Sequence, residues 1–222
     1  MQKNKTARVL LIGSFLLVGC KRNPVDRLRD PYPGGSVPLT SGVFTIYKDE
    51  LKTGGGFGFI PTGENQTIDS ADTSSPRLTA RSIKYSWNGQ DVLHTTDTVA
   101  NHAFAGFSLC VSPDLATVNS TPGKNLMAPS YTTLKLFVRG SLSSDTRLRI
   151  EGPGDNVLTP ARTELTSLSS DWQEVSLPIP TASDFSDVKI FLTISFQYSQ
   201  PSGTTTPGEG GVVYLDDIRY VQ

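Results

Sequence analysis

The residue types that most often carry catalysis are few in this chain and stand in no familiar catalytic pattern. His94 and His102 lie in one loop-like stretch, and neither belongs to an H-E-x-x-H or similar metal-binding motif. There is no G-x-S-x-G nucleophile elbow. The stretch "GGGFGF" at 54–59 is glycine-rich, but it lacks the helix and lysine that follow in a phosphate-binding loop. The sequence therefore gives an enzymatic function little support.

A hydrolase remains a minor alternative, because glycoside hydrolases need only a pair of carboxylates held about 5–9.5 Å apart across a cleft. The chain has 21 acidic residues, but their positions along the sequence do not place such a pair. A cleft that holds two carboxylates, or a histidine beside a carboxylate, would favour this alternative.

The stretch "RLRIEGP" at 147–153 indicates binding chemistry instead. Strand alternation directs Leu148 and Ile150 towards a core and directs Arg147, Arg149 and Glu151 outwards. A row of guanidinium and carboxylate groups can fix the hydroxyls of a polar ligand. The same row is also compatible with an ordinary solvated face, and the sequence leaves both interpretations open.

The stretch "YLDDIRY" at 214–220 places a carboxylate near the expected core. By simple alternation Asp216 shares a face with Ile218, so a buried Ile218 would direct Asp216 towards the interior edge. A buried carboxylate is costly unless it is paired or bound to metal. Asp216 could equally cap backbone N–H groups or pair with an arginine or lysine.

Composition narrows the class of protein further. The formal net charge is −1, with 20 basic and 21 acidic residues, and neither sign forms a block. Binding to nucleic acid or to a membrane through a polybasic segment is therefore not indicated.

Of the two cysteines, Cys110 is expected to be a small strand residue.

Nine short runs with alternating apolar residues predict an all-β domain of two packed sheets. Long loops are expected at 61–80, 88–102, 112–130 and 199–211. The nine runs are "VFTIYKDE", "FGFIP", "SIKYSW", "FAGFSLCV", "TLKLFVRG", "RLRIEGP", "WQEVSLPI", "VKIFLTISFQY" and "VVYLDDIRYV".

The first 19 residues are typical of a secretory signal peptide. Three basic residues precede the apolar run 9–18, which is too short to span about 30 Å of hydrocarbon as a helix. The ending Leu17-Val18-Gly19-Cys20 resembles the lipobox of bacterial lipoproteins. This resemblance implies that Cys20 becomes the acylated (palmitate-bearing) N-terminus, and Lys21 in place of aspartate implies the outer membrane of the cell envelope.

Residues 20–42 are expected to form a tether between this anchor and the folded domain. Four prolines in 21–42 make the segment fairly stiff. The folded domain is then expected to occupy 43–222, a length that suits one β-sandwich.

The second half of this domain resembles jelly-roll carbohydrate-binding modules of the galactose-binding-like superfamily. The resemblance lies in Trp172 with the "V-S-L-P" end of its strand, the apolar segment 188–196, and the last strand "VYLDDI" at 213–218. In the first half, "IYKDEL" at 46–51 resembles the first strand of these modules. The resemblance covers 43–222 and implies a two-sheet jelly-roll β-sandwich, galactose-binding-domain-like.

The resemblance also implies candidate sites. Many modules of this fold hold a structural calcium between the first and last strands, and Asp49, Glu50 and Asp216 are the matching oxygen donors. One outer sheet face is concave in this fold and binds the sugar. The candidates for that face are Phe104, Arg147, Arg149, Glu151, Trp172 and Glu174.

Packing roles remain open for the two tryptophans, since Trp172 can pack near a strand edge and Trp87 shares a face with Ile83 and Tyr85.

From the two resemblances together we expect a non-catalytic, lipid-anchored envelope protein that binds a poly- or oligosaccharide. The alternative is a structural or protein-interaction lipoprotein of the same fold that binds no sugar, which a large exposed apolar patch would favour.

Overall fold

The computed structural model describes residues 20–21, 42–52, 56–60, 66–77, 80–88, 102–112, 118, 120–126, 131–144, 146–153, 161–180, 186–199 and 210–222. The predicted signal peptide, most of the predicted tether and His94 lie outside these residues. The side chains of Cys20, His102 and Phe104 also lie outside the described part.

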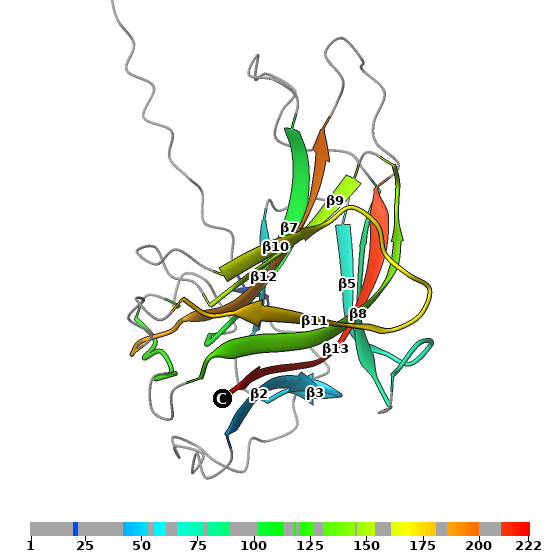
Figure 1. Ribbon diagram of the computed structural model, residues 1–222. Helices are drawn as coiled ribbons and strands as arrows, with labels where there is room; N and C mark the ends of the chain where they lie inside the picture. The colour runs from blue at the N-terminus through cyan, green and yellow to red at the C-terminus, as the bar shows by residue number, and fades with distance from the viewer. Residues whose placement is uncertain are drawn as a thin grey trace, which may run out of the picture.

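One antiparallel sheet has six strands, in the spatial order β1-β4-β7-β12-β9-β10 (Figure 1). We call it the six-stranded sheet. Its strands are β1 (Cys20–Lys21), β4 (Gly56–Ile60), β7 (His102–Cys110), β9 (Thr146–Gly152), β10 (Ala161–Leu165) and β12 (Ile190–Ser199).

The seven-stranded sheet has the path β11-β8-β13-β2-β3, and β6 adds to it by pairing with β13 and with β5. Its strands are β2 (Val43–Lys48), β3 (Glu50–Leu51), β5 (Gln66–Asp72), β6 (Ser82–Trp87), β8 (Thr133–Leu142), β11 (Gln173–Pro178) and β13 (Gly211–Val221). The first half of β13 pairs with β6 and the second half with β2, while β8 lies along its other side.

The order of the strands along the chain makes this sandwich a jelly roll. From β7 onwards the chain crosses repeatedly between sheets: β8, β11 and β13 join the seven-stranded sheet, while β9, β10 and β12 join the six-stranded sheet. Val118 is helical, and the other regular elements of the described part are strands. The predicted all-β, two-sheet jelly-roll class is confirmed. Within the described residues, no helix is both long and apolar enough to cross a bilayer.

The core is a layer of apolar side chains between the inner faces of the two sheets. Tyr85 of β6 stacks on Phe196 of β12, with ring centroids 5.1 Å apart, and meets the edge of Phe107 at 4.9 Å. All three rings are fully buried. Burial of each large apolar side chain contributes about 1.5–3 kcal/mol, so this layer holds the sheets together without a disulfide.

The last strand breaks the expected alternation at Asp217. This residue has φ 49°, a left-handed value that aspartate tolerates better than most side chains, and the register of β13 shifts there. Asp216 consequently pairs with Phe137 on the outer side of the sheet, while Ile218 points into the core. The expectation that Asp216 and Ile218 share a face is wrong, because the bulge inserts one residue between them.

Each of the nine predicted strand runs overlaps a strand, and "SIKYSW" coincides with β6. The sequence did not predict β5 or β10. Both are largely polar, and β5 lies in a segment expected to be a loop, so their own residues carry little alternation of apolar side chains. Pairing with β6 and β9 supplies their backbone hydrogen bonds. Cys20 and Lys21 also pair with β4.

Candidate functional site

The outer side of the six-stranded sheet carries a continuous set of polar side chains across β10, β9, β12 and β7. We call this set the outer polar face. Cross-strand pairing arranges it in rows: Glu164 beside Arg149 and Ser195, and Arg162 beside Glu151, Thr193 and Ser108. A third row pairs Arg147 with Gln197. The outer polar face is Ser108, Arg147, Arg149, Glu151, Arg162, Glu164, Thr193, Ser195 and Gln197.

Short side chains form the middle of this face. The hydroxyls of Ser108 and Thr193 lie 2.9 Å apart and hydrogen-bond across β7 and β12. In the next row Gly106 pairs with Ser195, and a Cβ at position 106 would come within 2.7 Å of the Ile194 carbonyl oxygen. Glycine therefore allows β7 and β12 to lie side by side here. The result is a low, hydroxyl-bearing floor.

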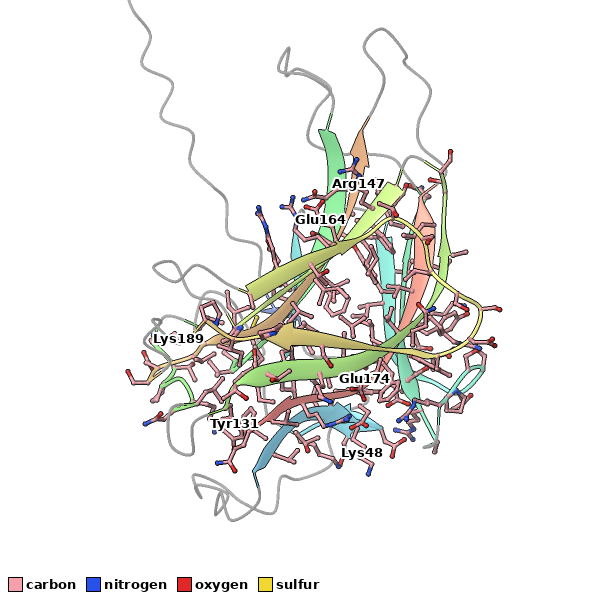
Figure 2. The ribbon with its side chains drawn as sticks, viewed as in Figure 1. Lys48, Tyr131, Arg147, Glu164, Glu174 and Lys189 are labelled. Carbon is pink, nitrogen blue, oxygen red and sulfur yellow. The ribbon has the colours of Figure 1, made fainter. Side chains whose placement is uncertain are left out.

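Charged side chains from β9 and β10 border this floor. The Nε and Nη2 atoms of Arg149 donate to Oε1 of Glu164 at 3.0 and 2.7 Å. Glu151 lies 3.9 Å from the same guanidinium, and Arg147 lies 3.7 Å from the second oxygen of Glu164. Figure 2 shows Arg147 and Glu164 close together on this side of the molecule. The network holds the Arg149 guanidinium in one orientation beside the floor.

These contacts set the protonation state of Glu164. The hydrogen bond from Arg149 holds the pKa of the Glu164 carboxyl below its usual value, and the positive charges of Arg149 and Arg147 act in the same direction. Glu164 is therefore ionised at neutral pH. A carboxylate in this state accepts hydrogen bonds and is poorly suited to act as a general acid, which requires a raised pKa.

The structure separates the six residues predicted for one sugar-binding face. Arg147, Arg149 and Glu151 lie together on the outer polar face, and Phe104 pairs with Gln197 at its margin. Glu174 belongs to β11 of the other sheet, where it pairs with Phe137 of β8, and Trp172 lies two residues earlier, directly before β11. The expectation that all six share a face is wrong, because the chain crosses to the seven-stranded sheet before β11.

Trp172 and Glu174 make structural contacts on the seven-stranded sheet. The Arg139 guanidinium lies 5.3 Å from the ring centre of Trp172 and 4.9 Å from that of Tyr214, so it is placed between two aromatic rings. Glu174 accepts a 2.8 Å hydrogen bond from Lys135, which holds the pKa of its carboxyl below the usual value.

Trp87 is 3% exposed and packs on Phe196, which confirms its packing interpretation.

The three carboxylates predicted to bind calcium make other contacts. Both oxygens of Asp216 accept backbone hydrogen bonds, from Asp217 at 2.7 Å and Arg77 at 3.2 Å. Oδ1 of Asp49 accepts from the N–H groups of Ala80 and Arg81 at 2.8 and 2.9 Å.

Glu50 pairs with Lys52 at 2.5 Å, on the exposed side of the β2–β3 turn. No group of three acidic, histidine or cysteine side chains that could hold a metal ion occurs within the described ranges. These residues do not fit a calcium site built from all three carboxylates, because the described structure does not group them and Asp49 and Asp216 already accept backbone hydrogen bonds.

The carboxylates of Asp49 and Asp216 nevertheless bring negative charge close to Tyr47 of β2. Burial raises the pKa of the Tyr47 hydroxyl, and the charges of Asp216 and Asp49 raise it further. The Tyr47 hydroxyl keeps its proton and donates a 2.9 Å hydrogen bond to the carbonyl of Ser70.

Sequence reasoning missed much of the outer polar face. Glu164, Thr193, Ser195 and Gln197 were not proposed, although "ARTEL" and "LTISFQY" both alternate in the way that "RLRIEG" does. The alternation in those runs indicates which side chains point outwards. It does not show that they lie beside Arg149, because that depends on the order of strands in the sheet, which places β12 and β10 on the two sides of β9.

Comparison with known proteins gives structural similarity only. No family model matches the chain, and no curated protein matches it. A family 30 carbohydrate-binding module superposes with a TM-score of 0.49 at 14% identity, over 81% of this chain and 87% of the module. A family 11 module from Clostridium thermocellum, solved with a β-1,3-1,4-mixed-linked tetrasaccharide, gives 0.44 at 14% identity over 82% and 96%.

TmCBM61, solved with β-1,4-galactotriose, gives a TM-score of 0.42 at 8% identity over 75% of this chain and 88% of that one. At this identity, and with these TM-scores, no residue or ligand is carried over from the modules to this chain. The architecture stands on the strand pairing described above.

The contact between Arg149 and Glu164 predicts a shift in a carboxyl pKa. Replacing Arg149 with methionine removes the guanidinium but keeps most of the side-chain length, so the pKa of Glu164 should rise towards its ordinary value. Above that value the ionised pair stabilises the folded state, and this contribution is lost as the pH falls through the folded-state pKa. NMR titration of the Glu164 carboxyl carbon measures the change.

Glu174 provides the internal control for this titration, since Lys135 and not Arg149 lowers its pKa. Its titration should be the same in both proteins. An unchanged Glu164 pKa in Arg149→Met would show that the contact is not formed in solution.

The N–H contacts of Asp49 and Asp216 predict that calcium removal has little effect on stability. We expect EDTA to leave the melting temperature unchanged, because the carboxylates keep their protein donors when no metal is present. Thermal unfolding followed by circular dichroism, with and without EDTA, measures this. A lower melting temperature that calcium restores would show that a calcium ion stabilises the fold after all.

Proposed function

We propose that this chain is a non-catalytic, carbohydrate-binding lipoprotein of the bacterial cell envelope, which binds a poly- or oligosaccharide on the outer polar face. The observation that carries the proposal is the combination on one rigid sheet of a hydroxyl floor and a fixed guanidinium. Thr193 and Ser195 contribute the accessible hydroxyls of the floor, and Arg149, held by Glu164, contributes the guanidinium.

The chemistry of this face matches that of a glycan. Sugar hydroxyls both donate and accept hydrogen bonds, and the face offers hydroxyls, carboxylates, guanidinium groups and the amide of Gln197. The accessible part of this face lies on β9, β10 and β12, where its side chains are exposed or half-buried, whereas Ser108 on β7 is 2% exposed. Three adjacent strands about 4.8 Å apart suit an extended chain better than a small enclosed ligand. Because the side chains are held by strand pairing and by ion pairs, little ordering is needed when a ligand binds.

The state of Glu164 suits a hydrogen-bond acceptor better than a general acid. Glu151 and Glu164 lie on either side of Arg149, which is the kind of acidic pair that a hydrolase would need. However, the lowered pKa of Glu164 leaves it without the proton that a general acid must donate.

Membrane attachment is proposed from the leader sequence. A basic n-region, a short apolar run and the Leu17-Val18-Gly19-Cys20 ending favour cleavage before Cys20 and acylation of its thiol. Two or more acyl chains would hold the domain stably on a bilayer.

A protein-interaction role without sugar binding is less well supported. It would be favoured by a broad apolar patch, but among the described residues Val43 is the one large apolar side chain that is exposed.

Binding to polysaccharides tests the proposed function. We expect saturable binding to at least one member of a panel of soluble and insoluble glycans, measured by affinity electrophoresis and pull-down. Ser195→Trp should cover the floor, and Arg149→Met should remove the guanidinium. Each is expected to weaken binding at least tenfold, because both groups face the ligand.

Ser176→Trp is the matched control, since Ser176 is an exposed serine on β11 of the other sheet. This variant should bind as the parent protein does. Absence of binding across the panel, or equal loss in Ser176→Trp, would contradict the proposal.

The proposed anchor makes a separate prediction for Cys20. Cys20→Ser removes the thiol that would be acylated, so the variant should incorporate no radiolabelled palmitate and should retain its leader when expressed in a bacterial host. Cys110→Ser is the control, because the buried Cys110 should play no part in anchoring. Normal palmitate incorporation in Cys20→Ser would refute the lipoprotein assignment.

A further inference from the structure

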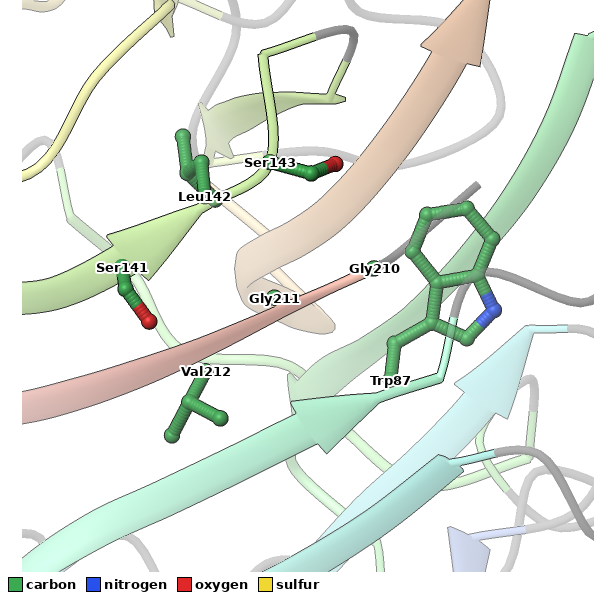
Figure 3. A pocket seen from close by; sticks show the side chains of 7 residues that line it. All are labelled: Trp87, Ser141, Leu142, Ser143, Gly210, Gly211 and Val212. Carbon is green, nitrogen blue, oxygen red and sulfur yellow. The ribbon is translucent and has the colours of Figure 1, made fainter. Parts of the chain in front are cut away.

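A pocket lies at one end of the sandwich, where β6 and β8 end and β13 begins (Figure 3). Its volume is about 320 Å³. None of the residues that line it belongs to the outer polar face. They are Trp87, Ser141, Leu142, Ser143, Gly210, Gly211 and Val212.

The walls of this pocket are held in place by strand pairing. Gly211 pairs with Trp87 on one side and with Leu142 on the other, so the three strand ends are fixed relative to one another. The backbone N–H of Ser143 donates a 3.1 Å hydrogen bond to the Gly210 carbonyl, which ties the turn after β8 to the start of β13. Gly210 has φ 69°, a conformation that favours glycine.

The indole of Trp87 forms a fixed wall. It lies nearly parallel to the ring of Phe196, with centroids 5.9 Å apart and an interplanar angle of 15°. Figure 3 shows the indole beside the backbone at Gly210 and Gly211. Trp87 is 3% exposed, so a ligand in the pocket would meet the small exposed part of the indole without needing it to move.

The polar groups of the described lining residues are uncharged. Ser141 is exposed, and the Ser143 hydroxyl lies 2.6 Å from that of Thr146. No acidic or basic side chain is among the seven lining residues. The pocket therefore combines hydroxyls and glycine peptide groups with apolar walls from Trp87 and Leu142, while the outer polar face is rich in charge.

We propose that this pocket is a second binding site, which takes a single neutral sugar ring. The hydroxyls of such a ring would meet Ser141, Ser143 and the glycine peptide groups, and its C–H groups would meet the apolar walls. The volume lies near the lower end of small-ligand sites, which are about 300–1,000 Å³, so it suits one ring better than a chain. The inference rests on the proposed function only for the class of ligand.

The two tryptophans of the chain allow a direct test. Neutral monosaccharides are titrated into the full chain, and the two indole N–H signals are followed by NMR at concentrations that would reveal millimolar affinity. Trp172→Phe assigns the signals. We expect at least one sugar to shift the Trp87 signal saturably. The Trp172 signal should stay in place, because its ring packs on Arg139 and does not line the pocket.

Two variants separate this pocket from the outer polar face. Ser141→Trp places a large side chain at the pocket and should lower the affinity for the monosaccharide at least tenfold, whereas Ser195→Trp should leave it unchanged. Ser176→Trp is again the matched control for a new tryptophan on the surface.

The outcomes for the two sites are distinguishable. No monosaccharide shift at Trp87, a shift that persists in Ser141→Trp, or a shift that Ser195→Trp abolishes would each overturn the second site, whether or not polysaccharides bind. A Trp87 shift in a protein that binds no polysaccharide would support the pocket and refute the proposed outer-face function.

Discussion

The burial of two sheet faces against each other is the constraint on which the rest of this structure depends. Tyr85 and Trp87 of one sheet stack on Phe196 of the other, and these rings fix the distance and angle between the sheets. Successive residues of a strand point to opposite sides of the sheet. When one residue points into the core between the sheets, its two neighbours along the strand therefore point to the outer surface. The polar rows on both outer surfaces are therefore a consequence of how the core is packed.

The two outer surfaces use their charges differently. On the seven-stranded sheet, arginines cover aromatic rings: Arg77 lies 3.2 Å from the centre of Phe137, and Arg139 lies between Trp172 and Tyr214. These rings are thereby shielded from solvent. On the six-stranded sheet, Arg149 is held by carboxylates beside short hydroxyl side chains, and no ring covers it among the described residues. The second arrangement leaves polar groups facing outwards, which is what recognition of a polyhydroxylated ligand requires.

Local backbone geometry then decides which individual groups face where. Asp216 follows the buried Leu215 and points outwards, and the left-handed Asp217 inserts one residue that returns Ile218 to the inner face. The Asp216 carboxylate is buried and accepts hydrogen bonds from the backbone N–H groups of Arg77 and Asp217. One irregular residue thus keeps the core continuous on both sides of an outward-facing carboxylate.

The sequence by itself determined the strands with strong alternation, the all-β class and the outward direction of Arg147, Arg149 and Glu151, because these depend on the period of a single strand. It also contains the basic and apolar pattern before Cys20 from which the lipid anchor is predicted. Only the tertiary structure decided which strands are neighbours. It brought Glu164, Ser195 and Thr193 beside Arg149, moved Trp172 and Glu174 to the other sheet, and gave Asp216 its backbone donors. The physical reason is that a cross-strand contact depends on the order of strands in a sheet and on bulges within them, and both are set by how the whole core packs.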